Sequence, residues 1–134
     1  MRVIILGSGR TGSRLATLLA DAGQDVTVID WNPAQFSRLP EDFPGTVVQG
    51  NGVDQDVLRE AGVEDADVFV AATSGDNRNI VASQIAQQVF QVPKVISRIK
   101  DPNRAALYSR LGIEVDCRTV EGAQALLELV DPST

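Results

Sequence analysis

The most informative part of the chain is the run Val3-Ile4-Ile5-Leu6-Gly7-Ser8-Gly9-Arg10-Thr11-Gly12-Ser13-Arg14-Leu15. An apolar segment of strand length leads into Gly-x-Gly-x-x-Gly, and the apolar periodicity of a helix follows. In such a turn the first glycine permits the sharp bend, the second lets a phosphate approach the backbone, and the third allows close helix–strand packing. The N–H groups of the first helical turn then face the phosphates. The run therefore predicts a nucleotide phosphate site at Gly7, Gly9 and Gly12.

A carboxylate follows at the spacing that such a site requires. Asp30 ends the next apolar run, 18 positions after Gly12, close to the roughly 20 residues at which an acidic residue accepts hydrogen bonds from ribose hydroxyls. No arginine directly follows Asp30 to hold a 2′-phosphate, so the pattern disfavours NADP. Two alternatives stay open at this point: a glycine turn kept for packing alone, and a strand-end aspartate that is only solvated.

The composition limits the classes of protein to which the chain can belong. It has 134 residues, of which 43% are hydrophobic, so we expect one domain with a real core. There is no histidine and only one cysteine, Cys117. Catalysis by a Ser-His-Asp or Cys-His set, histidine-ligated metals, cysteine-only metal sites and an internal disulfide are therefore excluded. The net charge of −6 argues against binding to nucleic acid or to an anionic membrane.

We expect a cytoplasmic location and no direct membrane insertion. Met1 opens almost directly into the first apolar run, which leaves no room for a signal peptide before it. The apolar runs are all far shorter than the roughly 20 residues of a membrane span.

Six apolar runs alternate with six helical patterns, which is typical of an α/β fold with a parallel sheet and helices on both faces. Because the glycine motif occupies the first strand–helix turn, we predict a doubly wound Rossmann fold with strand order 3-2-1-4-5-6. The predicted strands are Arg2–Leu6, Asp25–Asp30, Thr46–Gln49, Val68–Ala72, Lys94–Ile99 and Glu114–Cys117.

Helix caps and apolar faces can be assigned in the same way. Asp54, Asp101 and Thr119 are expected as N-caps, because each precedes a helical pattern. The expected apolar faces are Leu15, Leu18, Leu19 and Ala22 on the first helix, Val81, Ile85 and Val89 on the fourth, and Val120, Ala123, Leu127 and Val130 on the last.

The carboxyl ends of parallel strands form one rim, so the residues just after each strand are candidates for the ligand site. Small and polar residues follow the second, third and fourth strands, although each group would also suit a turn or a helix cap. Two arginines add positive charge at the rim. Besides Asp30 and the residues Gly7 to Gly12, which include Arg10, the candidates are Trp31, Asn32, Asn51, Gly52, Val53, Ala72, Thr73, Ser74 and Arg98.

We do not expect an enzyme, because the chain has no residues for a substrate domain beyond the nucleotide fold. Two other classes remain as alternatives. One is the cofactor-binding half of an NAD-dependent dehydrogenase, and the other is a structural or assembly module that binds no nucleotide.

These motifs resemble the RCK domain, also called the KTN or TrkA N-terminal domain, of bacterial Trk/Ktr-type potassium transporters and of potassium channels. The resemblance rests on an arginine after the second glycine and on the strand-end sequences, and it covers nearly the whole chain. The matching segments are Gly7-Ser8-Gly9-Arg10-Thr11-Gly12, Asp30-Trp31-Asn32, Gly50-Asn51-Gly52-Val53, Ala72-Thr73 through Asp76 to Asn79, and Ser97-Arg98-Ile99 with Asp101-Pro102.

The resemblance implies that residues 1–134 are a single regulatory domain that binds ATP, ADP or AMP, or NAD or NADH. It places Asn51, Gly52 and Val53 by the adenine and Thr73 and Ser74 in the pocket lining. It also implies a homo-oligomer, a dimer or a ring of dimers, attached to an integral-membrane potassium transporter or channel at the inner face of the cell membrane.

The family further implies that the arginine at position 10 contacts phosphate across a subunit interface. Asn32 and Asn51 depart from the family pattern, because each replaces an acidic residue.

Overall fold

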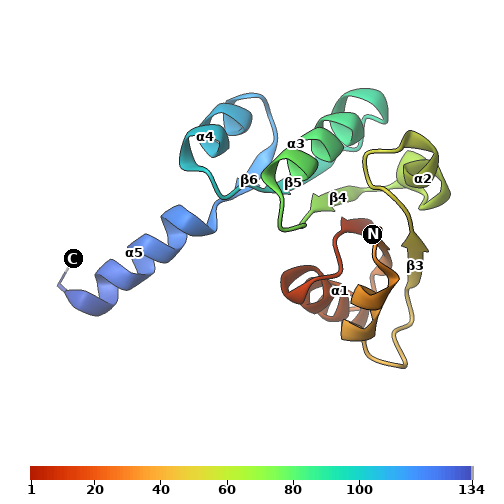
Figure 1. The fold of residues 1–134 in the computed structure, drawn as a ribbon, viewed down its shortest axis with the longest axis horizontal. Helices are drawn as coiled ribbons and strands as arrows, with labels where there is room; N and C mark the ends of the chain where they lie inside the picture. Colours follow the sequence, from red (N-terminus) through yellow and green to blue (C-terminus); the bar gives the residue numbers. More distant parts are fainter. Residues whose placement is uncertain (134) are drawn as a thin grey trace.

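Six parallel strands form one sheet in the order β3-β2-β1-β4-β5-β6 in the computed structural model, which describes residues 1–133 (Figure 1). The predicted strand order and doubly wound architecture are confirmed. The last three strands each end one residue earlier than the sequence predicts. The strands are β1 (Arg2–Leu6), β2 (Asp25–Asp30), β3 (Thr46–Gln49), β4 (Val68–Ala71), β5 (Lys94–Arg98) and β6 (Glu114–Asp116).

Helical segments connect every pair of consecutive strands. The α-helices are α1 (Arg10–Asp21), α2 (Gln55–Glu60), α3 (Asp76–Gln84), α4 (Pro102–Arg110) and α5 (Arg118–Val130). Shorter segments are η1 (Pro33–Arg38), η2 (Val63–Asp65) and η3 (Ile85–Val89), the last being a π-helical turn that continues α3.

Two of the three expected N-caps are present. The carboxylates of Asp54 and Asp101 accept the N–H groups of Asp56 and Asn103. The third expectation, Thr119, is wrong: α5 begins at Arg118, because the backbone is extended only as far as Cys117, which is the N-cap residue.

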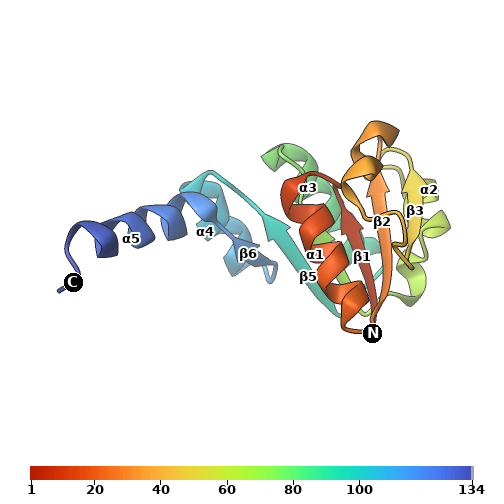
Figure 2. The same ribbon diagram turned by 90° about the horizontal axis from the view of Figure 1, so that it is seen from below.

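Two apolar layers cover the sheet, one on each face. On one face Ile4, Leu6 and Phe69 belong to a buried cluster that includes residues of α2 and α3. On the other face Val3 and Ile5 pack with residues of α1 and η1. Helix α1 packs against β1 and β2, and Figure 2 shows it running alongside β1. Because both faces of the central strands are buried, their sequences are continuously apolar rather than alternating.

The buried faces of two helices differ from the predicted ones. On α1 the predicted Leu15 and Leu19 pack against the apolar layer, but Leu18 is 52% exposed, and Gly12 and Ala16 are among the residues that are buried. On α3 the buried residues are Asn79, Ile80, Ala82 and Ser83, whereas Val81 faces outward. Small residues at these contacts let both helices approach the strands closely.

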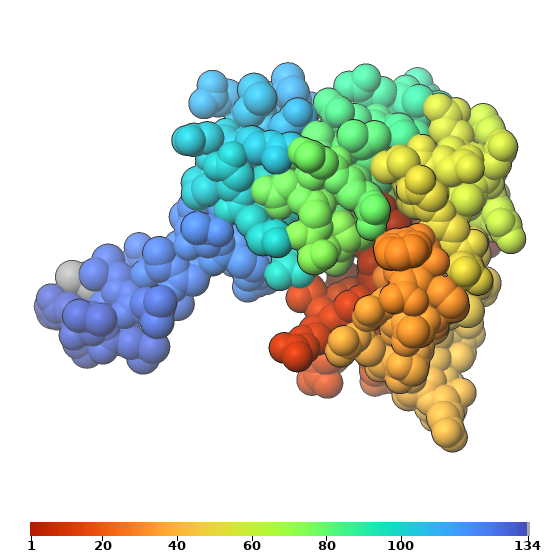
Figure 3. Space-filling view, in the orientation of Figure 1, coloured from red at the N-terminus to blue at the C-terminus, as the bar shows by residue number. Residues whose placement is uncertain are grey.

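The last helix stands clear of the body of the molecule (Figures 1 and 3). None of its residues is buried, and the apolar face predicted for it is uncovered. Val120, Leu126, Leu127, Leu129 and Val130 are between 46% and 82% exposed. In residues 1–133 no helix has both the length and the apolar composition needed to cross a bilayer.

An apolar groove of about 410 Å³ lies between α1 and β5, on the α1 side of the sheet. We call it the α1–β5 groove. Its floor is formed by β4 and β5, its wall by α1, and charged side chains border it. The lining residues are Met1, Val3, Thr11, Leu15, Leu19, Val68, Val70, Ala72, Lys94, Ile96, Arg98, Asp116 and Arg118.

Candidate nucleotide-binding site

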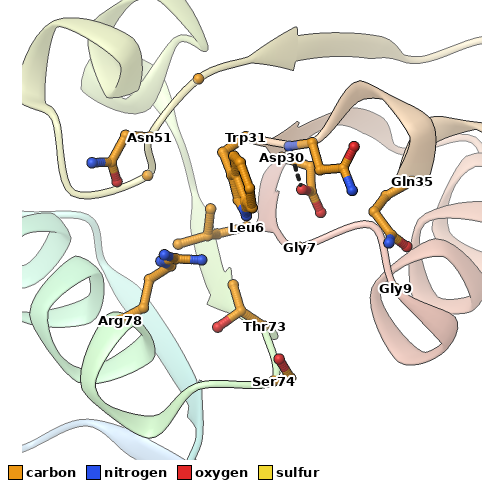
Figure 4. A pocket seen from close by; sticks show the side chains of 13 residues that line it. Leu6, Gly7, Gly9, Asp30, Trp31, Gln35, Asn51, Thr73, Ser74 and Arg78 are labelled. Carbon is orange, nitrogen blue, oxygen red and sulfur yellow. Dashed lines mark hydrogen bonds between the residues drawn. The ribbon is translucent and has the colours of Figure 1, made fainter.

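A cavity of about 330 Å³ opens at the carboxyl ends of β1 to β4, where the order of the strands reverses. This is the place at which doubly wound sheets bind their ligands. Figure 4 shows its side chains pointing into one space from several strand ends. The lining residues are Leu6, Gly7, Gly9, Asp30, Trp31, Asn32, Gln35, Gly50, Asn51, Gly52, Thr73, Ser74 and Arg78.

The glycine turn forms one end of the cavity. Gly7 has a φ of +107°, a conformation that favours glycine, and a Cβ there would press on the carbonyl of Ala72. A Cβ on Gly12 would overlap the carbonyl oxygen of Gly7, so only glycine lets α1 come this close to the turn. Gly9 is the N-cap residue of α1, and no side chain of the described residues caps the helix. A Cβ on Gly9 would meet no other atom within 4 Å, so the space beside it is open. The first N–H groups of α1 can therefore receive an anion.

Asp30 ties the glycine turn to the end of β2. Its Oδ2 accepts the backbone N–H of Ser8 at 2.8 Å, and its Oδ1 accepts the N–H of Asn32 at 2.9 Å. Each carboxylate oxygen can accept a second hydrogen bond, so both can still meet hydroxyl groups of a ligand. The carboxylate thus shapes the phosphate loop as well as facing the pocket.

Trp31, Asn51 and Gly52 form the opposite end of the cavity. The indole of Trp31 is 63% exposed, and the Oδ1 of Asn51 accepts the N–H of Val53 at 3.2 Å. A Cβ on Gly52 would run into the side chain of Leu6, so this loop lies close to the end of β1. A flat, partly apolar surface with a free amide group suits a nucleotide base.

The far wall is held in place by Asn79, which is fully buried on α3. Its Nδ2 donates to the carbonyl oxygens of Thr73 at 3.0 Å and Arg98 at 2.8 Å, and its Oδ1 accepts the N–H of Thr73 at 2.9 Å. One side chain therefore joins the loop after β4 to the end of β5. This fixes Thr73 and Ser74 at the rim of the cavity.

Nine of the predicted site residues line the cavity: Gly7, Gly9, Asp30, Trp31, Asn32, Asn51, Gly52, Thr73 and Ser74. The others lie elsewhere. Ser8 and Gly12 support the turn from behind, and Val53 packs against the core. Thr11 and Ala72 line the α1–β5 groove.

Two predicted cations also lie outside the cavity. Arg98 lines the α1–β5 groove, because side chains alternate along β5 and its neighbour Ser97 faces the opposite side of the sheet. Arg10 lies in an adjacent open cavity of about 550 Å³ with Arg14 and Arg38.

Four lining residues are additional to the predicted ones: Leu6, Gln35, Gly50 and Arg78. Gly50 stands in a segment that the family resemblance already singles out. Arg78 is two residues after Asp76 in another such segment, whereas Gln35 reaches the cavity only because η1 folds back over the turn.

The fold and the glycine turn define a Rossmann-type domain with a ligand cavity at its switch point. Residues 3–117 match the family model described as the TrkA-N domain, and the chain belongs to this family. The resemblance inferred from the sequence is therefore confirmed.

A relative named "Trk system potassium uptake protein TrkA" from Streptomyces coelicolor is 47% identical over 133 residues. The match covers 99% of this chain and 60% of that protein, so this chain spans less than two thirds of the relative.

Two solved structures share the fold. The Shewanella denitrificans Kef CTD in AMP bound form is 28% identical, with a TM-score of 0.79 over 98% of this chain and 82% of that one. The TrkA-N domain of the inner membrane protein ybaL from Escherichia coli is 21% identical, with a TM-score of 0.84 over 97% of this chain and 96% of that one.

Proposed function

We propose that residues 1–134 are a nucleotide-binding regulatory domain that controls a membrane potassium transporter or channel. The observation on which this rests is the cavity at the switch point, with the uncapped N-terminus of α1 at one end and Asp30 beside it. The potassium uptake protein among its relatives supports the role in potassium transport. The family favours this role over the cofactor half of a dehydrogenase.

The ligand is an adenine nucleotide, either AMP, ADP or ATP, or NAD or NADH. The first turn of α1 suits phosphate groups, and Asp30 suits two ribose hydroxyls but repels a 2′-phosphate. The AMP bound in the similar Kef domain supports an adenine nucleotide. The domain acts by binding rather than by catalysis, since Asp30 and Arg78 are the ionisable residues that line the cavity.

The active form is a homo-oligomer, in which α5 of one copy fills the α1–β5 groove of a second copy. The helix has an uncovered apolar face, and the groove has an apolar floor of Val68, Val70 and Ile96. Burying the two surfaces against each other removes both from water, which favours association. The assembly would sit at the cytoplasmic face of the membrane through its transporter or channel partner.

Isothermal titration with AMP, ADP, ATP, cyclic di-AMP, NAD, NADH, NADP and NADPH tests the proposed ligand class. We expect binding of at least one adenine nucleotide without a 2′-phosphate, and NADH bound more tightly than NADPH. If no nucleotide binds, the domain is a structural module. If NADPH binds more tightly than NADH, the assignment of Asp30 to the ribose is wrong.

A further inference from the structure

Two flat side chains approach each other across one end of the nucleotide cavity. Trp31 follows β2 and Arg78 lies in the first turn of α3, so they come from opposite walls (Figure 4). Asn51 lies beside them, whereas Gly9 and the N-terminus of α1 lie at the other end. The pair therefore stands where the base of a nucleotide would lie, not where its phosphates would.

Arg78 has no partner within residues 1–133: no carboxylate there forms an ion pair with it, and no acceptor takes its hydrogen bonds. A cation in the first turn of a helix is opposed by the helix dipole, so helix stability does not explain its position. The nearby Asp76 is engaged elsewhere, because its two oxygens accept the N–H groups of Lys100 and Asp101. The guanidinium is thus free to meet a ligand.

Both side chains line the same cavity of about 330 Å³. Within the part of the chain that the structure describes, a cation–π contact joins Arg59 to Phe90, and none joins Arg78 to Trp31. Trp31 is 63% exposed, so much of its surface remains available to a ligand. An indole and a guanidinium that face an open gap from opposite walls form a slot.

We propose that Trp31 and Arg78 form a slot for a purine base, with the indole stacked on one face of the base and the guanidinium on the other. This inference rests on the proposed nucleotide-binding function and assigns to Arg78 a role in selecting the base. Aromatic rings and arginine planes both stack on bases. A bicyclic purine covers more of the slot than a single pyrimidine ring does.

Asn51 adds a contact at the edge of the base. Its Oδ1 accepts the N–H of Val53, so the amide keeps its Nδ2 hydrogens as donors for a ring nitrogen of the base. In this arrangement the glycine turn holds phosphate and Asp30 holds ribose. The effect of Arg78 on affinity is therefore independent of the number of phosphates.

The test uses adenosine, AMP, CMP and ribose 5-phosphate, with Arg78→Ala and the second variant Arg78→Gln. The control is Arg110→Ala, which removes an exposed arginine from the distant end of α4. Trp31 is the single tryptophan, so its fluorescence reports occupation of the slot. Affinities come from titration calorimetry.

We expect AMP to bind more tightly than CMP and to change the fluorescence of Trp31, whereas ribose 5-phosphate leaves the fluorescence unchanged. Both Arg78 variants should lose about tenfold in affinity for adenosine and for AMP alike, while Arg110→Ala changes neither. A loss for AMP without a loss for adenosine would make Arg78 a phosphate contact and overturn the slot. Affinities equal to those of the wild type would also overturn it, whereas a wild-type protein that binds no nucleotide would instead refute the proposed function.

Discussion

The backbone N–H of Ser8 donates to the carboxylate of Asp30 across 2.8 Å, which joins the phosphate loop after β1 to the end of β2. Ser8 is fully buried, and Asp30 is the acceptor that the structure gives to its backbone N–H. The acidic residue expected to bind ribose therefore also holds the loop that binds phosphate.

Replacing Asp30 should reduce both stability and binding. Asp30→Ala leaves the buried N–H of Ser8 unpaired and should lower the free energy of unfolding by about 1–3 kcal/mol. Asp30→Asn keeps one acceptor oxygen and should lose less. Both variants should bind nucleotide about 10- to 150-fold more weakly. Urea denaturation and calorimetry measure the two effects, with the exposed Asp42→Ala as control; equal stability of the Ala and Asn variants would contradict this account.

Asn79→Ala should destabilise the rim on the other side of the cavity. The buried amide satisfies polar groups of Thr73 and Arg98, and its loss leaves them unpaired. We expect a loss of at least about 2 kcal/mol in the free energy of unfolding. Asn103→Ala, which changes an exposed asparagine, is the matched control. If Asn79→Ala were as stable as this control, the hydrogen bonds of Asn79 would make no contribution to stability.

Asp76 should give the protein a dependence on acid pH. Burial raises the pKa of its carboxyl, but hydrogen bonds from the backbone N–H groups of Lys100 and Asp101, with the charges of Arg104 and Lys100, outweigh this effect and lower the pKa below the ordinary value of an aspartate. Because the pKa of Asp76 is lower in the folded protein than in the unfolded chain, the ionised carboxylate stabilises the fold at pH values above the unfolded pKa. This stability is lost as pH falls from about 4 through the folded pKa.

The free energy of unfolding, followed by urea titration between pH 7 and pH 3, measures this dependence. Asp76→Asn should have a lower free energy of unfolding than the wild type at pH 7. The difference between the two free energies should become smaller as the pH falls below about 4. A gap that stays constant over this range would assign the acid sensitivity to other carboxyl groups.

Arg10→Ala should weaken the response to ATP more than the response to AMP. Arg10 lies with Arg14 and Arg38 in the cavity next to the glycine turn, so we expect it to contact the outer phosphates of ATP or a phosphate bound to a second copy. One exposed cation should contribute about 1–2 kcal/mol at most to ATP binding. Calorimetry with both ligands checks this, and equal losses for ATP and AMP would show that Arg10 does not sense the additional phosphates.

Charged substitutions on α5 should prevent self-association. Leu126→Asp and Leu129→Asp place a carboxylate on the uncovered apolar face. Light scattering should give an oligomer for the wild type and a monomer for these variants. Leu107→Asp changes an exposed leucine of α4 and serves as control; a wild type that is monomeric at all concentrations would rule out the proposed exchange of helices.

Sequence patterns predict the strands and their order because the controlling signals are local. The Gly7–Gly12 motif and the continuously apolar strands fix the strand order through general rules on crossovers.

Features that depend on contacts between distant segments could not be predicted. Arg98 and Thr73 both lie at the carboxyl-terminal edge of the sheet, so the sequence places them in one site. The side chain of Arg98 instead points to the α1–β5 groove, on the face of the sheet opposite to α3, and the packing of α3 on one face cannot be read from the sequence. Leu18 fits the apolar period of α1, yet the close approach at Gly12 rotates it outward. Gln35 and Arg78 enter the cavity only through the arrangement of η1 and α3 in space.

Helix α1 is a wall shared by three spaces. Gly9 at its start lines the nucleotide cavity, Arg10 and Arg14 line the adjacent open cavity of about 550 Å³, and Leu15 and Leu19 line the α1–β5 groove. If bound nucleotide shifts α1 to a second position, the shape of the groove changes with it, and linkage requires the effect to be mutual. A segment that binds in the groove and favours one of these two positions then changes the affinity of the domain for nucleotide. Bound nucleotide changes the affinity of the groove for that segment by the same factor.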